Sequence, residues 1–490
     1  MSTICGELVA ESPGGLNVIP PPLVVDLDGT LVRTDLLLES VLALVRREPI
    51  LVFMLPFWLL HGIAKFKHEI ARRISLDLVS LPWRTEFINF LAQQRGEGRS
   101  LVLATGSDIR LARQVADHLK IFDRVVATDE TTNFCGAAKR DYLVRHFGSK
   151  GFDYAADGGT DDLTVWASAR QAVLINLSSR ERRAAAAVAP VERVFADPNS
   201  SRMALVRALR LRHWLKNLLI FVPLIAAHRF QEVPMLLRTL LAFIAFGCCA
   251  SSGYLFNDLI DLEADRHHPQ KKFRPFAAGT APLAYGFVAI PFLLLAGCLL
   301  AFFVSPLLCL VTLIYFLMTI AYSLHLKKVA VLDVLILAGL YSLRLMAGSA
   351  AVGIRSSHWL LAFSIFLFFS LALAKRYGEL VIMHRVDGDQ ARARGYELHD
   401  EELLAAMGVA SGYLAVLVLA LYITSEKARI LYDNPELLWF LCPLLLYWIS
   451  HIWLTAHRGK MHHDPVVFAT SDRASQILLL LMTGTAFLAV

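Results

Sequence analysis

The chain of 490 residues is 56% hydrophobic, has a mean hydropathy of +0.52 and carries a formal net charge of +6. So small a positive charge excludes the dense basic surface that a nucleic-acid-binding domain needs in order to neutralise many phosphates. Because the N-terminal segments nevertheless mix polar and apolar residues, the composition excludes a single soluble domain and predicts a soluble part followed by a membrane part.

The N-terminal part is predicted to be an α/β domain. It begins without a basic stretch leading into an apolar core, so we expect no signal peptide and a cytoplasmic location. Short β-type runs alternate with helical stretches, which favours a parallel, doubly wound sheet. The expected strands are 23–27, 100–105, 124–127, 153–156, 172–176 and 191–195. Residues 35–93 are expected to form a helical cap, whose apolar run at 50–60 is too short for a membrane span and is predicted to be buried, with contact to lipid left open.

The polar residues 197–201 predict a boundary between a domain at 1–201 and a membrane domain at 202–490. Basic and apolar residues alternate over 202–216, which predicts an amphipathic helix on an anionic membrane surface. Nine apolar segments follow as expected spans: 217–228, 236–256, 282–303, 305–323, 330–352, 358–374, 404–424, 436–455 and 475–490. Lys and Arg gather in alternate loops, which predicts a multi-pass protein of a bacterial-type inner membrane with its polar clusters on the cytoplasmic side.

Carboxylates and a lysine stand at the expected strand ends of the N-terminal domain. Asp26-Leu-Asp28-Gly-Thr30 follows the first strand, Thr105 ends the second, Lys139 precedes a helix, and Asp157 and Asp161 follow the fourth. This order resembles the haloacid-dehalogenase-like phosphatases, whose fold is a Rossmann-like parallel sheet with a helical cap. The resemblance implies Asp26 as nucleophile, Asp28 as general acid and base, Thr105 and Lys139 as phosphate ligands, and Mg²⁺ held by Asp26, Asp28, Asp157 and Asp161. The fourth element reads Ala156-Asp157-Gly158-Gly159 instead of the usual Gly-Asp-Ser start, which leaves the surroundings of the metal open.

The membrane domain carries an aspartate-rich motif directly after its second apolar run. Asn257, Asp258, Asp261 and Asp265 recur at helical spacing, so at least three of them share one face and can converge on Mg²⁺. The basic residues that follow can bind phosphate oxygens. Carboxylates that can hold a metal ion, with basic side chains beside them at a membrane boundary, together indicate a binding site for a diphosphate.

The motif and the nine expected spans resemble the UbiA-type superfamily of intramembrane prenyltransferases, which implies an all-α bundle. Residues 212–217, 257–279, 322–334, 344–348, 375–379 and 463–466 resemble its branch that makes polyprenyl-phosphoryl 5-phosphoribose from phosphoribosyl pyrophosphate and polyprenyl phosphate. Asp333 is followed four residues later by Leu337, so the second acidic pair usual in prenyl diphosphate enzymes is incomplete, which suits a single Mg²⁺ site. The resemblance implies Asp258 and Asp261 as catalytic residues, and Mg²⁺ on Asn257, Asp258 and Asp261. It implies substrate binding by Lys216, Asn217, Asp265, Arg266, Lys271, Lys272, Arg274, Lys327, Asp333, Arg344 and Lys375. The phosphate of the acceptor is expected near Lys327, Lys328, Arg344 or Lys375.

Some of these cations have a second interpretation. Lys327, Lys328, Lys375 and Arg376 equally fit charges that only orient the membrane segments. Arg344 falls inside a span, where an unpaired cation is costly, so a functional or paired role is favoured.

Phosphoribosyl transfer leaves a 5-phosphate on the lipid-linked ribose, which a neighbouring phosphatase can remove. We therefore expect a bifunctional enzyme that makes polyprenyl-phosphoryl 5-phosphoribose and then hydrolyses its 5-phosphate. The nearer alternative is a prenyltransferase that joins a polyprenyl diphosphate to an aromatic acceptor in quinone or haem synthesis, with an accessory phosphatase domain. The farther one is a transporter or scaffold. The sequence leaves the oligomeric state open, a homo-oligomer included, and gives no sign of a nucleic-acid partner.

Overall fold

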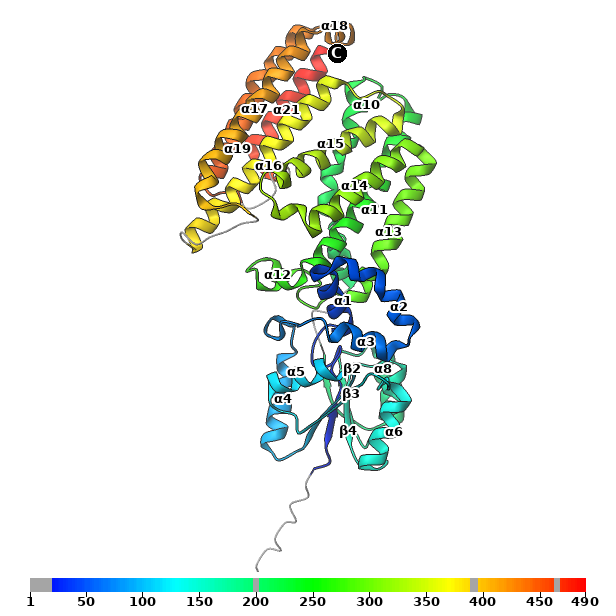
Figure 1. Ribbon diagram of the computed structural model, residues 1–490. Helices are drawn as coiled ribbons and strands as arrows, with labels where there is room; N and C mark the ends of the chain where they lie inside the picture. Colours follow the sequence, from blue (N-terminus) through cyan, green and yellow to red (C-terminus); the bar gives the residue numbers. More distant parts are fainter. Residues whose placement is uncertain (1–19, 197–201, 388–394, 462–467) are drawn as a thin grey trace, which may run out of the picture. The chain divides into compact units, whose positions relative to one another are not determined.

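The computed structural model describes residues 20–196, 202–387, 395–461 and 468–490 (Figure 1). The chain divides into two compact units. The first comprises 1–201 with the short segments 266–272 and 277–283, and the second comprises 202–265, 273–276 and 284–490.

The first unit is built on a six-stranded sheet in which every neighbouring pair of strands is parallel. The strands are β1 (Leu23–Val25), β2 (Leu101–Asp108), β3 (Arg124–Thr128), β4 (Asp153–Ala156), β5 (Ala172–Ile175) and β6 (Val191–Phe195), in the order β3-β2-β1-β4-β5-β6. This confirms the predicted parallel α/β fold.

Helices cover both faces of this sheet, because successive residues of a strand point to opposite sides. Leu23 and Val25 of β1 belong to one hydrophobic cluster, whereas Val24 belongs to another. The first cluster includes residues of α4 (Thr85–Gly96) and α5 (Ile109–Leu119). The second includes residues of α6 (Gly136–Phe147), α7 (Thr160–Trp166) and α8 (Ser179–Val188). The sheet is therefore doubly wound.

The segment between β1 and β2 is helical, as expected. It contains α1 (Leu36–Arg47), η1 (Pro49–Met54), α2 (Leu55–Leu60), α3 (Ile63–Ala71), η2 (Leu78–Ser80) and α4. The prediction that its apolar run is buried is wrong: Ile50, Phe53 and Leu60 are 80%, 84% and 85% exposed, and Trp58 is the one buried side chain of η1 and α2. Two such short helices can turn only one side toward the protein, and a run that is apolar all round then leaves the rest uncovered.

The second unit is a bundle of apolar helices. Among the described residues, seven helices are long and apolar enough to cross a membrane: α11 (Val233–Ile260), α13 (Leu283–Val304), α14 (Pro306–Leu324), α15 (Leu332–Val352), α16 (His358–Asp387), α17 (Glu401–Thr424), and η8 (Pro435–Phe440) continuing into α19 (Leu441–His457). The first and last predicted spans are not among them. Residues 217–228 are divided between η3 (Leu211–Phe221) and α10 (Val222–Ala226), and the C-terminal helix α21 (Arg473–Ala489) has 17 residues. The count of nine spans is therefore not confirmed.

Shorter elements join these helices. They are α9 (Arg202–Ala208), α12 (Leu262–His267), η4 (Lys271–Phe273), η5 (Leu326–Lys328), η7 (Leu398–Asp400) and α18 (Glu426–Leu431). The single amphipathic helix expected over 202–216 is thus divided between α9 and η3.

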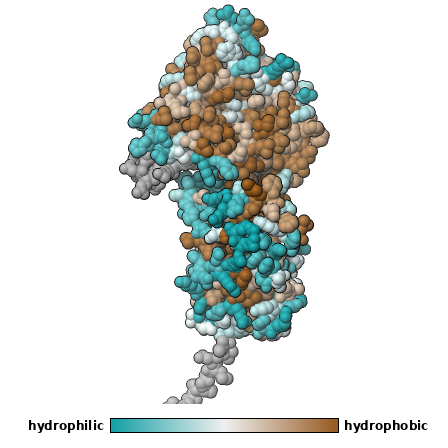
Figure 2. All heavy atoms as spheres, in the orientation of Figure 1, coloured by the Kyte–Doolittle hydropathy of each residue, from teal (hydrophilic) through white to brown (hydrophobic). Residues whose placement is uncertain are grey.

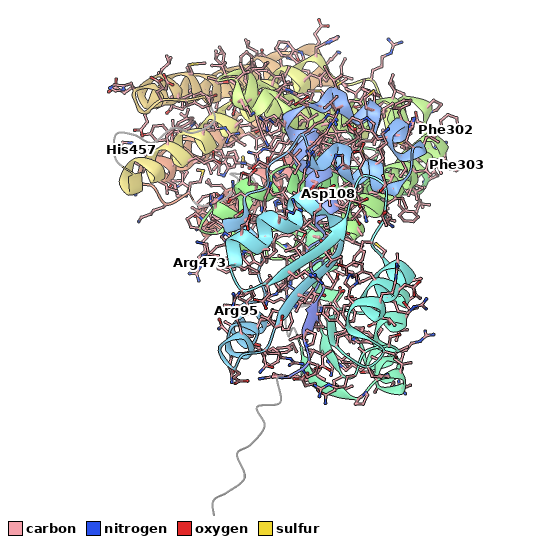
Figure 3. The ribbon with its side chains drawn as sticks, turned by 60° about the horizontal axis from the view of Figure 1, so that its bottom comes forward. Arg95, Asp108, Phe302, Phe303, His457 and Arg473 are labelled. Carbon is pink, nitrogen blue, oxygen red and sulfur yellow. The ribbon has the colours of Figure 1, made fainter. Side chains whose placement is uncertain are left out.

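The helices differ in how far the bundle encloses them. Buried residues make up 17% of the apolar stretch of α13 but 72% of that of α15. Phe302 and Phe303 of α13 lie at the outer edge of the bundle (Figure 3), and hydrophobic side chains make up most of the visible face of this unit (Figure 2). Helix α15 is therefore central, and α13 has the apolar surface of a helix that faces lipid.

Candidate functional site

The strand ends of the first unit bring Asp26, Lys139 and Tyr154 together. Asp26 directly follows β1, and Lys139 lies in the first turn of α6 rather than before a helix. The Nζ of Lys139 donates to Oδ1 of Asp26 at 2.7 Å and to the hydroxyl of Tyr154 at 3.1 Å. The carboxyl ends of parallel strands, where the strand order changes direction, are the usual place for a ligand in such a sheet.

Asp28 is held by two donors beside this group. Its Oδ1 accepts from the main-chain N–H of Leu36 at 2.7 Å, and its Oδ2 accepts from the hydroxyl of Ser107 at 2.6 Å. The Oγ1 of Thr105 in turn accepts from the N–H of Ser107 at 3.1 Å. Burial raises the pKa of Asp28 to about 7, helped by the negative charges of Asp35 and Asp26. A carboxyl group that titrates near neutral pH is suited to both giving and taking a proton.

Asp157 and Asp162 add further buried acid to the same edge of the sheet. Burial and the charge of Asp26 raise the pKa of Asp157 to about 8 and that of Asp162 to about 7. Gly29 has φ +69°, and a Cβ at this position would lie 1.9 Å from Oδ2 of Asp157, so only glycine lets this carboxylate approach the loop after β1.

This surplus of negative charge fits a hard cation that takes oxygen ligands. Within the described ranges, no group of three or more His, Cys, Asp and Glu side chains is arranged to hold a metal ion. Mg²⁺ nevertheless needs only one or two carboxylates, because water completes its coordination. The donor set of Asp26 and Asp157 is therefore compatible with Mg²⁺.

Besides Tyr154, two residues of this region, Asp162 and Lys67, were not predicted. Asp161, the expected metal ligand, is exposed beside Gly136, whereas its neighbour Asp162 is buried and accepts from the hydroxyl of Tyr154 at 2.7 Å. Lys67 of α3 donates to the carbonyl of Gly106 at 2.6 Å. The adjacent pair Asp161-Asp162 could have indicated Asp162, because a helix turns only one of two adjacent residues inward. A lysine in a cap gives no such signal.

The aspartate-rich motif of the second unit is surrounded by cations. Asp258 and Asp265 are buried, and Nη1 of Arg274 lies 3.2 Å from Oδ1 of Asp258 and 2.5 Å from Oδ2 of Asp265. Arg210, just before η3, also pairs with Asp258.

The other two members of the motif meet α14 and η5. Lys327 pairs with Asp261, and the hydroxyl of Ser323 donates to Oδ1 of Asn257 at 3.0 Å. The structure therefore brings five of the predicted site residues, Asn257, Asp258, Asp261, Asp265 and Arg274, together with the predicted Lys327. It adds Arg210, for which the sequence indicated only a membrane-surface charge.

Asp333 has a different environment. It is fully buried, its Oδ2 accepts from Nε of Arg376 at 2.5 Å, and its Oδ1 accepts from the hydroxyl of Tyr396 at 2.6 Å. Arg376 also pairs with Glu379 at 2.5 Å. Both oxygens of Asp333 are thus engaged inside the bundle, and Arg376 is a buried residue rather than a loop charge.

Arg344 of α15 lies in a span, as expected, and is 3% exposed. It donates to Oδ1 of Asn217 at 3.0 Å, to the hydroxyl of Tyr315 at 3.0 Å and to the carbonyl of Leu340 at 2.5 Å. The predicted residues Arg344 and Asn217 are therefore in direct contact.

The remaining predicted cations lie elsewhere. Arg266 belongs to a segment of the first unit and donates to the carboxylate of Glu39 at 2.5 Å and to the carbonyl of Ala277 at 3.3 Å. Lys271 and Lys272 lie in η4, and Lys375 is half-buried on α16. The motif at 463–466 lies outside the described residues.

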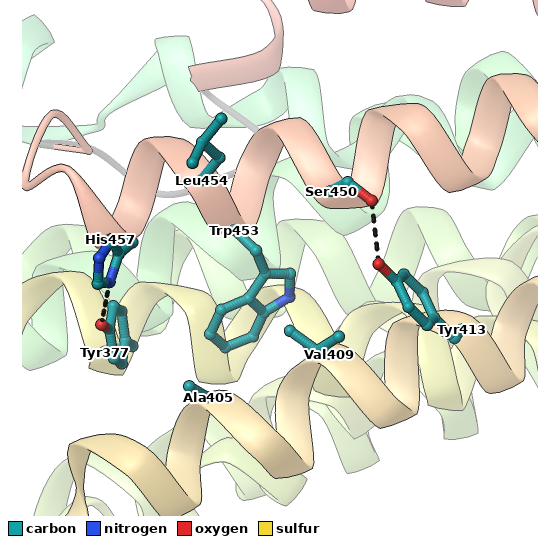
Figure 4. Close-up of a pocket in the computed structure, with 8 residues that line it drawn as sticks. All are labelled: Tyr377, Ala405, Val409, Tyr413, Ser450, Trp453, Leu454 and His457. Carbon is teal, nitrogen blue, oxygen red and sulfur yellow. Dashed lines mark hydrogen bonds between the residues drawn. The ribbon is translucent and has the colours of Figure 1, made fainter.

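A cavity of about 290 Å³ lies among α16, α17 and α19 (Figure 4). Its lining residues are Tyr377, Ala405, Val409, Tyr413, Ser450, Trp453, Leu454 and His457. Tyr377 and His457 are hydrogen-bonded at 2.8 Å, and Tyr413 and Ser450 at 3.1 Å. None of the predicted site residues lines this cavity.

Comparison with known proteins covers both parts of the chain. The model of the "UbiA prenyltransferase family" matches residues 218–486. An uncharacterized protein of Sinorhizobium fredii, y4nM, is 34% identical over 476 residues, which is 96% of this chain and 91% of that protein. A decaprenyl-phosphate phosphoribosyltransferase of Mycobacterium tuberculosis is 32% identical over 308 residues, which is 61% of this chain and 98% of that protein. A solved UbiA homolog from Archaeoglobus fulgidus, bound to DMAPP and Mg²⁺, is 16% identical, with a TM-score of 0.44 over 58% of this chain and 98% of that chain.

Proposed function

This chain belongs to the UbiA prenyltransferase family, and we propose that its membrane part transfers a 5-phosphoribosyl group from phosphoribosyl pyrophosphate to a polyprenyl phosphate. In this reaction an oxygen of the acceptor phosphate attacks the anomeric carbon of the ribose. The bond between that carbon and the diphosphate oxygen breaks, and pyrophosphate leaves. The relative from Mycobacterium tuberculosis, named for this transfer, supports the choice of substrates.

The observation that carries the proposal is the mixture of acids and bases at the aspartate-rich motif. Asn257, Asp258 and Asp261 supply the oxygen atoms that would hold Mg²⁺, which when bound stabilises the negative charge of the leaving pyrophosphate. Arg274 and Lys327 stand within ion-pair distance of these carboxylates. The oxygen ligands for the metal ion and the cations for the phosphate groups of a diphosphate therefore lie in one place.

The ion pairs also explain how the motif is kept ready without a substrate. Buried Asp258 has Arg210 and Arg274 as partners, so its charge is compensated before any ligand binds. Once a bound Mg²⁺ neutralised the carboxylate, Arg210 and Arg274 would be available to the oxygen atoms of a diphosphate. Because the side chains already lie there, little reorganisation is needed.

We assign the removal of the 5-phosphate to the first unit, as a phosphatase of the haloacid-dehalogenase-like type. Lys139 holds Oδ1 of Asp26, so Oδ2 attacks the phosphorus, and the ester bond breaks to give an aspartyl phosphate. Asp28 gives its proton to the departing ribose oxygen and then takes one from the water that hydrolyses the aspartyl phosphate. Mg²⁺ held by Asp26 and Asp157 would screen the repulsion between nucleophile and phosphate.

Two features support joining these activities in one chain. Phosphoribosyl transfer leaves a phosphate monoester on its product, whereas prenyl transfer to an aromatic acceptor leaves none for a phosphatase to remove. The exposed apolar side chains Ile50, Phe53 and Leu60 also suit an enzyme whose substrate is anchored in lipid. We place both active sites on the cytoplasmic side of the inner membrane.

The test uses membranes that contain the full chain, supplied with Mg²⁺, phosphoribosyl pyrophosphate and polyprenyl phosphate. The wild type should form lipid-linked ribose, and Asp26→Asn should accumulate lipid-linked ribose 5-phosphate. If neither lipid forms, the transferase proposal fails; if Asp26→Asn yields the same product as the wild type, the phosphatase proposal fails. A parallel arm with a prenyl diphosphate and an aromatic acid tests the alternative that the family name favours.

A further inference from the structure

Arg344 is a buried cation whose contacts are all with uncharged groups. Its partners are the amide oxygen of Asn217, the hydroxyl of Tyr315 and the carbonyl of Leu340. In the part of the chain that the structure describes, no ion pair joins Arg344 to a carboxylate. Arg376 on the neighbouring helix is equally buried but has Asp333 and Glu379 as partners. Because a charge in a low-dielectric interior is costly without a counter-ion, Arg344 indicates that an anion belongs beside it.

Asn217 gives a second, independent indication. It is 1% exposed, and its Nδ2 is buried without a hydrogen-bond partner among the described residues. Its Oδ1 accepts from Arg344, so the amide is fixed with Nδ2 as the unused donor. A buried donor without an acceptor is destabilising, and native structures seldom contain one. The missing group must therefore accept hydrogen bonds as well as carry negative charge.

Lys216 brings a second positive charge to this place. Its Nζ lies 5.4 Å from the centre of the Tyr341 ring, and the guanidinium of Arg344 lies 5.4 Å from the same ring. Arg344, Asn217 and Lys216 form what we call the Arg344 cluster. Its two positive charges match a phosphate monoester, which carries about −1.5 to −2 at neutral pH.

The helix η3 connects this cluster with the aspartate-rich motif. His213 and Lys216 are three residues apart on this 3₁₀-helix, so their side chains lie on one face, and Arg210 directly precedes the helix. Arg210, before the start of η3, pairs with Asp258, and Lys216, in the middle of η3, lies over Tyr341. At about 2 Å per residue, Lys216 lies roughly 10 Å along the helix from Leu211, the residue that follows Arg210. This spacing suits a donor held at Asp258 and an acceptor held at Arg344.

We infer that the Arg344 cluster binds the phosphate group of the polyprenyl phosphate acceptor, an inference that rests on the proposed phosphoribosyl transfer. The donor diphosphate has its own cations, Arg210, Arg274 and Lys327, at the motif. The guanidinium of Arg344 lies instead over the ring of Phe246, which belongs to a hydrophobic cluster that includes residues of α11, α14 and α15. A lipid tail is compatible with those surroundings, whereas a water-soluble sugar diphosphate is not.

The test measures binding and kinetics on the full chain with Asn217→Asp and Arg344→Met. Asn217→Asp supplies Arg344 with the counter-ion it lacks, so this variant should be at least as heat-stable as the wild type. Farnesyl phosphate serves as the probe in thermal unfolding, with farnesol and inorganic phosphate as controls. Arg355→Gln, at an exposed position after α15, is the matched control variant.

Farnesyl phosphate, but not farnesol, should raise the melting temperature of the wild type and of Arg355→Gln, and should leave Asn217→Asp and Arg344→Met unchanged. In the transfer assay, the KM for polyprenyl phosphate should rise at least tenfold in Asn217→Asp while the KM for phosphoribosyl pyrophosphate stays within twofold. Equal stabilisation of wild type and Asn217→Asp overturns the inference, and so does an equal effect of inorganic phosphate. A wild type that binds farnesyl phosphate in this way but transfers no phosphoribosyl group counts against the proposed function alone.

Discussion

The buried ion pair between Asp333 and Arg376 gives a prediction whose size follows from its geometry. Asp333 is fully buried, and within the described part of the chain its carboxylate accepts side-chain hydrogen bonds from Arg376 and from the hydroxyl of Tyr396. Arg376→Met therefore leaves a buried carboxylate with one neutral donor, which should cost about 3–5 kcal/mol. Asp333→Asn is milder, because Arg376 keeps Glu379 and Tyr322, and should cost about 1.5–3 kcal/mol.

These costs are measurable as shifts of the melting temperature. At about 2–4 °C per kcal/mol for a domain of roughly this size, Arg376→Met should lower the midpoint by about 10 °C and Asp333→Asn by roughly half as much. Thermal unfolding in detergent, followed by tryptophan fluorescence, provides the assay. The double variant should lose less than the sum of the two single variants, because it removes both buried charges together.

The same variants decide whether Asp333 binds substrate or stabilises the bundle. If it is structural, Asp333→Asn that is folded at the assay temperature should keep its KM for phosphoribosyl pyrophosphate. If Asp333→Asn had an unchanged melting temperature and a tenfold higher KM for phosphoribosyl pyrophosphate, the reasoning would be refuted and Asp333 would be assigned to the substrate site.

Three further predictions concern the two candidate sites. Arg274→Met should lower kcat/KM for phosphoribosyl pyrophosphate by about 10- to 100-fold, the value of one or two hydrogen bonds between charged groups, whereas an unchanged value would remove this residue from the diphosphate site. Burial raises the pKa of Asp157 to about 8, far above that of the unfolded chain, so the folded state keeps a proton that the unfolded state loses. In a chelating buffer the melting temperature should therefore fall from about pH 4 to about pH 8, less so in Asp157→Asn, and a rise with pH would contradict this. Phe53→Ser should slow hydrolysis of lipid-linked ribose 5-phosphate but not of p-nitrophenyl phosphate, whereas Val79→Ser, at a position 76% exposed, should affect neither; equal loss on both substrates would argue against a contact with lipid.

The sheet of the first unit could be predicted because its strands are buried and their sequences are therefore mainly apolar. All three residues of β1 are buried, as are all four of β4 and of β5, and the short runs of β1 and β4 end directly before Asp26 and Asp157. Parallel strands covered on both faces produce this pattern. The same reasoning predicted that the apolar run at 50–60 is buried, and this prediction is wrong. Hydropathy does not distinguish an apolar segment that packs against the protein from one that stays exposed.

The membrane part shows a similar limit. The motif from Asn257 to Asp265 could be found because its spacing is local. Its partnership with Arg210 could not, since the pairing depends on how η3 lies against α11, and 48 residues separate Arg210 from Asp258. Arg376 looked like a loop charge because a hydropathy window ends at the first cation, whereas α16 continues through it to Asp387. Pro223 at the start of α10 and the 3₁₀ geometry of η3 divide the expected first span, a local break that an apolar average conceals.

The central claim is tested most directly by following both halves of a doubly labelled phosphoribosyl pyrophosphate, with one label in the ribose and another in the diphosphate. Proteoliposomes of the full chain with polyprenyl phosphate and Mg²⁺ should move the ribose label into the lipid phase and leave the diphosphate label in the water, and Asp261→Asn should abolish this transfer. Ribose label that stays in the water with the wild type, while the same proteoliposomes join a prenyl diphosphate to an aromatic acid, would contradict the account.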